Sequence, residues 1–114
     1  MWRDDPLLLD MLLAAGHARD HVGGLSRDQF LASKLHQDAV IRELEVLGEA
    51  AARVTEEIRA ECPEIPWPQI VGLRNRLIHE YFRVRLDAVW EVVTTELPPL
   101  IEQLMAITPP GDGS

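Results

Sequence analysis

The residues whose side chains are best suited to catalysis lie in one short segment, Arg74-Asn75-Arg76-Leu77-Ile78-His79-Glu80-Tyr81. An arginine guanidinium keeps its charge and can donate two hydrogen bonds to one phosphate. A histidine, which ordinarily titrates near pH ~6.5, can take a proton from a ribose 2′-hydroxyl or give one to a leaving oxygen. Arg74 and His79 therefore predict chemistry at an RNA phosphate that needs no metal.

Positive charge is concentrated around this segment. Residues 69–85 contain four arginines and one acid and carry +3, whereas the rest of the chain carries −11. The net charge of −8 argues against a surface for DNA or membranes, because both depend on broad positive potential. An alternative is that Arg76 pairs with Glu80 one helical turn away and that the other arginines are simply solvated.

Helix geometry sets a condition on catalysis. At about 100° per residue, Arg74 and His79 lie some 140° apart, whereas Arg74 shares a side with Tyr81 and Asn75 shares one with His79. Convergence is easier if two copies of this helix meet across a two-fold axis and send both residue types into one cleft. The catalytic interpretation therefore predicts a homodimer.

Other candidate residues have simpler explanations. His17 and His21 are one helical turn apart, but no third ligand nearby completes a zinc site, so we predict no metal and no cofactor. Glu49 either contacts the active cleft or pairs with an arginine one turn later. Trp67 and Trp90 lie beside apolar positions, which favours core or interface anchors over platforms for stacking bases.

Two helical elements are predicted ahead of the central part of the chain. The first helix runs from Asp4 or Asp5 to about Val22, with Pro6 in its first turn. Ser26 and Gln29 have the spacing of a capping box, which predicts a short helical turn through residue 32.

An apolar stripe and a proline-rich loop predict the second and third helices. A close approach of another helix is possible at Gly48 and the alanines after it. Pro63, Pro66 and Pro68 end the second helix, and Pro68 opens a third over about 69–81. The stripe steps by four and three along the second helix and contains Val40, Leu44, Leu47, Ala51, Val54 and Ile58.

A fourth helix is predicted from about Asp87, with a bend or break at Pro98-Pro99. Its buried side contains Val89, Trp90, Val93, Leu97, Leu100, Ile101 and Leu104. No segment alternates like a strand. The predicted fold is all-α: an antiparallel four-helix bundle with one short extra helical turn, forming a single domain over 1–107 with a flexible tail at 108–114.

Composition limits where this domain acts. A chain of 114 residues with 46% hydrophobic residues suits one globular core. The lone Cys62 favours a reducing compartment, which makes the cytosol the expected location. The acidic start is unlike a signal peptide, and no apolar run approaches the ~20 residues that span a bilayer.

Several motifs, taken together, resemble a known family. The arrangement Arg-x4-His-x-Tyr at Arg74, His79 and Tyr81 resembles the signature of the HEPN superfamily. The surrounding segments narrow the resemblance to HepT-like toxins, and they occur in the family's order along nearly the whole chain: 37–42 (QDAVIR), 47–51 (LGEAA), 63–67 (PEIPW) and 73–82 (LRNRLIHEYF).

The resemblance implies a dimeric helical bundle that acts as a metal-independent endoribonuclease toxin of a type VII-like toxin–antitoxin pair. It implies catalytic positions at Arg74 and His79, with Asn75 as a supporting polar residue. The implied partner is a nucleotidyltransferase (MntA-like) antitoxin that attaches AMP to Tyr81. A phosphodiester there would compete with substrate phosphate for Arg74 and so switch the enzyme off.

Two other interpretations stay open at this point. The chain could be a non-catalytic, RNA-binding or adaptor partner of a nucleotidyltransferase, since its acidic remainder suits a basic protein partner. Alternatively, Arg74 and His79 could be residues of a dimer interface and nothing more.

Overall fold

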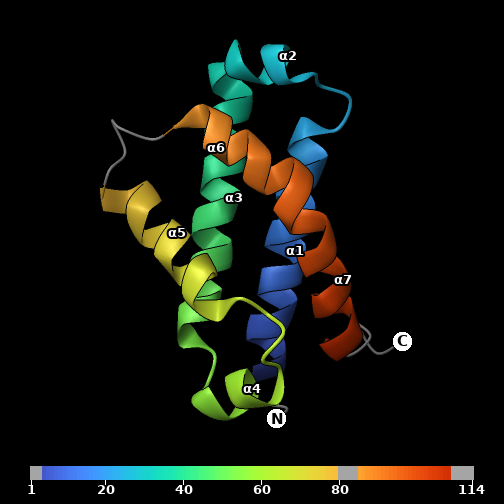
Figure 1. Cartoon of the computed structure of the whole chain (residues 1–114), viewed down its shortest axis with the longest axis vertical. Coiled ribbons are helices and arrows are strands. Elements are labelled where there is room, and N and C mark those ends of the chain that lie inside the picture. The colour runs from blue at the N-terminus through green and yellow to red at the C-terminus, as the bar shows by residue number, and fades with distance from the viewer. Residues whose placement is uncertain (1–3, 80–84, 109–114) are drawn as a thin grey trace.

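The computed structural model describes residues 4–79 and 85–108, and every element in these two ranges is helical (Figure 1). This confirms the all-α prediction. The α-helices and one π-helical segment are, in chain order, α1 Asp5–Val22, α2 Arg27–Leu31, α3 Lys34–Arg53, α4 Glu56–Glu61, α5 Trp67–His79, α6 Leu86–Glu91, the π-helix Val92–Glu96 and α7 Leu97–Ile107.

The beginning of the chain folds as its local signals predict. Helix α1 starts after Asp4, carries proline in its first turn and ends at Val22, with Gly23 as its C-cap. Gly24 has a φ of 83°, a left-handed conformation that glycine adopts without steric cost. The capping box is present in full, because the Ser26 hydroxyl accepts from the Gln29 N–H and the Gln29 side chain accepts from the Ser26 N–H.

The segment predicted as one second helix forms two helices, α3 and α4. Helix α3 ends at Arg53, Val54 is extended, and Thr55 begins the separate helix α4 by accepting a hydrogen bond from the Ile58 N–H. The Thr55 hydroxyl satisfies one of the free N–H groups of a new helix, which competes with continuing the old one. The apolar stripe is nevertheless buried throughout, because α4 brings Ile58 back to the same core.

The prolines act where they were expected to act. Helix α4 ends ahead of Pro63, and Pro68 is the second residue of α5, where its missing N–H costs nothing. In the C-terminal region the chain changes direction between α6 and α7 (Figure 1). The predicted bend is therefore present, and it coincides with the π-helix just before Pro98-Pro99.

The π-helix explains how the chain keeps its helical coil past two prolines. Pro98 and Pro99 cannot donate to the carbonyls four residues earlier, and their rings would clash with those carbonyls in an α-helix. The wider π turn has the Leu97 N–H donate to the carbonyl of Val92, five residues earlier. The helix therefore widens at this point and does not break.

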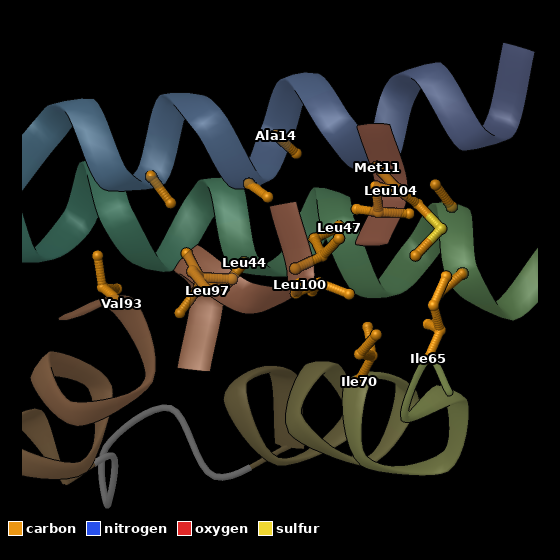
Figure 2. Packing of buried hydrophobic residues seen from close by; sticks show 14 of the residues in the cluster. Met11, Ala14, Leu44, Leu47, Ile65, Ile70, Val93, Leu97, Leu100 and Leu104 are labelled. Carbon is orange, nitrogen blue, oxygen red and sulfur yellow. The ribbon is translucent and has the colours of Figure 1, made fainter. Parts of the chain in front are cut away.

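One hydrophobic core joins the long helices. Helix α3 packs along α1 on one side and along α5 on the other, and α7 packs on α1. Figure 1 shows α1 and α3 running side by side in opposite directions. Figure 2 shows side chains from several elements in this core, among them Met11 of α1, Leu47 of α3, Leu104 of α7 and, between α3 and α5, Ile70 of α5.

The described residues measure 42 × 31 × 20 Å, so the thinnest direction corresponds to about two helix diameters. None of the described helices is long and apolar enough to cross a membrane. The antiparallel bundle of four helices, the single domain over 1–107 and the dimer stay predictions. Residues 109–114 of the predicted tail lie outside the described residues.

Candidate active site on helix α5

Helix α5 carries the predicted site residues on its polar sides. Its apolar side is anchored in the core by Ile70 and Leu77, which are both buried. Arg74 is partly buried, whereas Asn75 and His79 are exposed. The core therefore anchors one side of α5, and Asn75 and His79 on its other sides are exposed to solvent.

Arg74 lies at a close contact between α5 and α3. A side chain at Gly48 of α3 would collide with Cβ of Arg74 and would lie 2.8 Å from its Cγ and 3.1 Å from the carbonyl oxygen of Ile70. Only a residue without Cβ permits this approach. The sequence signal for it was the small-residue run at Gly48, which predicted a close approach without naming the partner helix. The structure identifies the partner as α5.

The Arg74 guanidinium has two polar partners. Its Nη2 donates to Oε2 of Glu49 at 2.7 Å, and its Nη1 donates to Oδ1 of Asn75 at 2.9 Å. Its Nε is buried and has no hydrogen-bond partner among the residues that the structure describes. Of the two alternatives for Glu49, the structure shows contact with the candidate active-site arginine. Sequence reasoning missed this pair, although Glu49 directly follows the glycine that makes the contact possible.

His79 is the last residue of α5 and is exposed. Because α5 is a regular helix from residue 67 to 79, the five-residue step from Arg74 places the two side chains on different sides of it. None of the hydrogen bonds or ion pairs among the described residues involves His79. One chain, as far as it is described, does not bring Arg74 and His79 together.

The rest of the basic segment is only partly described. Tyr81, the predicted modification site, lies outside the described residues, as does Glu80, the proposed partner of Arg76. Arg85 donates from Nη2 to Oδ2 of Asp87 at 3.0 Å. This hydrogen bond lowers the pKa of Asp87 below its ordinary value. Some of the positive charge that the sequence predicts is thus already paired.

A pocket of about 370 Å³ lies beside Glu49. Most of its lining residues belong to α3, two belong to α1 and one belongs to α5. Its lining includes Ile78, the neighbour of His79, but neither Arg74 nor His79 themselves. The lining residues are Leu7, Asp10, Arg42, Glu45, Val46, Glu49, Ala50, Arg53 and Ile78. The pocket therefore adjoins the candidate site without joining its two principal residues.

The two histidines of α1 flank a carboxylate of α3. Nδ1 of His17 is 3.8 Å from Oε1 of Glu43, and Nε2 of His21 is 3.6 Å from Oε2. Among the residues that the structure describes, no group of three His, Cys, Asp or Glu side chains could hold a metal ion. The contacts in this cluster link α1 to α3.

The tryptophans pack as the sequence predicts. Trp67 is buried, its indole N–H donates to the carbonyl of Cys62 at 3.0 Å, and the guanidinium of Arg59 lies over its ring. Trp90 is partly buried against Phe30, with ring centroids 5.5 Å apart. Both are core anchors.

Fold and site together define an all-helical protein with a basic cluster on one helix, packed closely on its neighbour. The chain matches the family model described as "Ribonuclease HepT-like" over residues 11–107. It belongs to the HepT-like ribonuclease family, which confirms the resemblance seen in the sequence.

Similar proteins support the same family. A protein of Caldanaerobacter subterraneus subsp. tengcongensis named "Putative RNase" is 34% identical over 102 residues, which cover 90% of this chain and 91% of that protein. A Methanocaldococcus jannaschii protein also named "Putative RNase" is 35% identical over 100 residues, covering 88% and 83%. A Thermococcus cleftensis protein named "Probable ribonuclease HepT" is 40% identical over 73 residues, covering 64% and 66%. No solved structure matches the chain.

Proposed function

We propose that the chain is a metal-independent endoribonuclease toxin whose catalytic residues are Arg74 and His79. The observation that carries this proposal is the placement of Arg74. In a chain of the HepT-like ribonuclease family, this arginine is fixed on the contact between two helices while 28% of its side chain stays exposed. A charged donor held in this way suits an RNA phosphate.

The proposed reaction divides the work between two side chains. Arg74 binds the scissile phosphate and stabilises the charge that develops on its oxygens. His79 takes the proton of the adjacent 2′-hydroxyl as its oxygen attacks phosphorus, or gives a proton to the 5′ oxygen as it leaves. Asn75 supports the reaction by accepting a hydrogen bond from Nη1 of Arg74.

The active form in this proposal is a homodimer. Arg74 and His79 lie on different sides of α5, so an arginine of one protomer meets a histidine of the other across a two-fold axis. An exposed apolar side chain, Ile78, lies next to His79 and is available to such an interface.

The test is cleavage of RNA in the presence of EDTA. We expect the wild-type protein to cleave, and His79→Ala and Arg74→Ala to lose about 10²–10⁴-fold in rate, the range typical of removing an acid–base group or a transition-state donor. Arg76→Ala is the matched control, because it removes the same charge from an exposed position of the same helix. Cleavage by His79→Ala at the wild-type rate would rule out its catalytic role.

The proposed regulator is a nucleotidyltransferase antitoxin that attaches AMP to Tyr81. An AMP group places a phosphodiester near Arg74, where it competes with the substrate for the guanidinium. Mass analysis of the chain after coexpression with a candidate nucleotidyltransferase antitoxin should show one added AMP on Tyr81. An inhibited complex with unmodified Tyr81 would mean that binding alone inhibits.

One observation favours a second candidate function. The Arg74 guanidinium is engaged by Glu49 and Asn75, as expected if it serves structure in a non-catalytic RNA-binding or adaptor partner of a nucleotidyltransferase. This candidate predicts RNA binding without turnover. Cleavage in EDTA that depends on His79 would exclude it.

A further inference from the structure

We infer that Glu49 is a positioning residue for Arg74: its carboxylate holds the guanidinium in the orientation that receives the substrate phosphate. This inference rests on the proposed function and adds a residue to it. The contact is a charge-assisted hydrogen bond of 2.7 Å between Oε2 of Glu49 and Nη2 of Arg74. Such bonds are shorter and stronger than those between neutral groups.

The stem of Arg74 is held by its contact with α3. Its Cβ and Cγ lie against Gly48, which fixes where the side chain leaves α5. The stem does not fix the guanidinium, because the outer torsions of arginine remain free to rotate. Within the described ranges its buried Nε has no hydrogen-bond partner, so the contacts that orient the guanidinium are those of the two Nη atoms.

The two Nη atoms of Arg74 contact partners on different helices. Asn75 is the next residue on the same helix and offers a neutral oxygen to Nη1, whereas Glu49 comes from α3 and offers a charged one to Nη2. Partners on two different helices hold the plane of the guanidinium more firmly than one neighbour can. Glu49 also follows Gly48 directly, so the same short stretch of α3 contacts both the stem and the head of Arg74.

Arg74 keeps N–H donors that can bind a phosphate. A guanidinium has five N–H groups, and the two contacts leave further donors on Nη1 and Nη2. The Arg74 side chain is 28% exposed and that of Glu49 is 57% exposed, so the pair lies at the surface where RNA can reach it. An ion pair this exposed contributes little to folding. Its main effect is to orient the donor.

A competing role for the same contact has the opposite sign. If the carboxylate instead occupied the phosphate position, removing it would strengthen RNA binding and raise activity. Positioning predicts a lower kcat, because a small displacement of a catalytic group is costly to the rate.

The experiment compares Glu49→Ala and Glu49→Gln with Glu45→Ala. Glu45 lies one turn earlier on α3 and lines the same pocket, so its removal changes the local charge without touching Arg74. We expect Glu49→Ala to lower kcat about 10-fold with a smaller change in KM, following the cost of misplaced groups. Glu49→Gln keeps an acceptor oxygen and should fall between the wild type and Glu49→Ala. Glu45→Ala should match the wild type.

A second measurement does not depend on cleavage. In the wild type and in Glu45→Ala, NMR relaxation of the Arg74 Nε–H group should show an ordered side chain, and in Glu49→Ala a mobile one. Ordered Arg74 in Glu49→Ala, or activity at or above the wild-type level in that variant, would overturn the inference. If the wild-type protein does not cleave RNA, the proposed function fails, and the NMR comparison still decides whether Glu49 positions Arg74.

Discussion

Helix α3 makes two close helix contacts that are built from different residues. Towards α1, in which Ala14, Ala15 and Ala18 are buried, the charged residues meet only at 3.6–3.8 Å. Towards α5, a single glycine admits the stem of an arginine, and a charged pair meets at 2.7 Å. The α1–α3 contact mainly buries apolar surface, whereas the α3–α5 contact places a polar group.

Stability and the candidate site therefore depend on different sides of helix α3. Apolar burial is non-directional and its stabilising effect grows with the area buried, so the α1–α3 contact contributes mainly to stability. A guanidinium that must meet a phosphate requires a defined position. Changes on the α1 side of α3 should therefore affect unfolding, and changes on the α5 side should affect the site.

The largest expected effect tests the α1–α3 contact. Met11 is fully buried on α1, and Met11→Ala should lower the free energy of unfolding by about 2–5 kcal/mol, the usual cost of emptying a core site. Urea denaturation measures this change. Leu13→Ala on the exposed side of α1 should be nearly neutral. Activity per folded molecule should stay at the wild-type level in both variants.

The next effect tests the α3–α5 contact. Gly48→Ala places a methyl group against Arg74, so the two helices must separate, which should cost about 1–3 kcal/mol and displace the guanidinium. Gly72→Ala is the control, because nothing lies within 4 Å of its new methyl group and alanine favours the helix. A Gly48→Ala protein with wild-type stability and activity would show that the close contact is unnecessary.

The smallest expected effect compares the two carboxylates of α3. Glu43 lies near His17 and His21 at distances beyond a hydrogen bond, so Glu43→Gln should change the free energy of unfolding by less than about 1 kcal/mol. Its RNA cleavage should equal that of the wild type, in contrast to Glu49→Ala. A loss of cleavage in Glu43→Gln with unchanged stability would remove the distinction between the two sides of the helix.

Local signals in the sequence predicted much of the fold. Capping residues, prolines and apolar spacing identified the helices, because each acts within one or two turns. The end of α3 at Arg53 was missed, since an apolar stripe continues through Ile58 whether one helix or two helices carry it. The π-helix was missed because it depends on how the chain accommodates Pro98 and Pro99 in three dimensions.

The position of the candidate residues was predictable from the sequence, but their contacts were not. Residue types and spacing pointed to Arg74 and His79 on one helix, the family resemblance added Asn75, and the structure places all three on α5, while their roles stay predictions. The pairing of Arg74 with Glu49 joins residues 25 positions apart, and it arises only when Gly48 lets α5 approach α3. Sequence spacing carries no information on that distance. Tyr81 lies outside the described residues, and its role stays a prediction.

The central claim, that Arg74 of one protomer works with His79 of the other, is tested most directly by mixing two inactive variants. Arg74→Ala and His79→Ala proteins with distinct affinity tags are mixed, and the mixed dimers are isolated by purification on both tags. They should regain RNA cleavage in EDTA, because each mixed dimer contains one intact site. Mixed dimers that form but do not cleave would contradict a site shared between two chains.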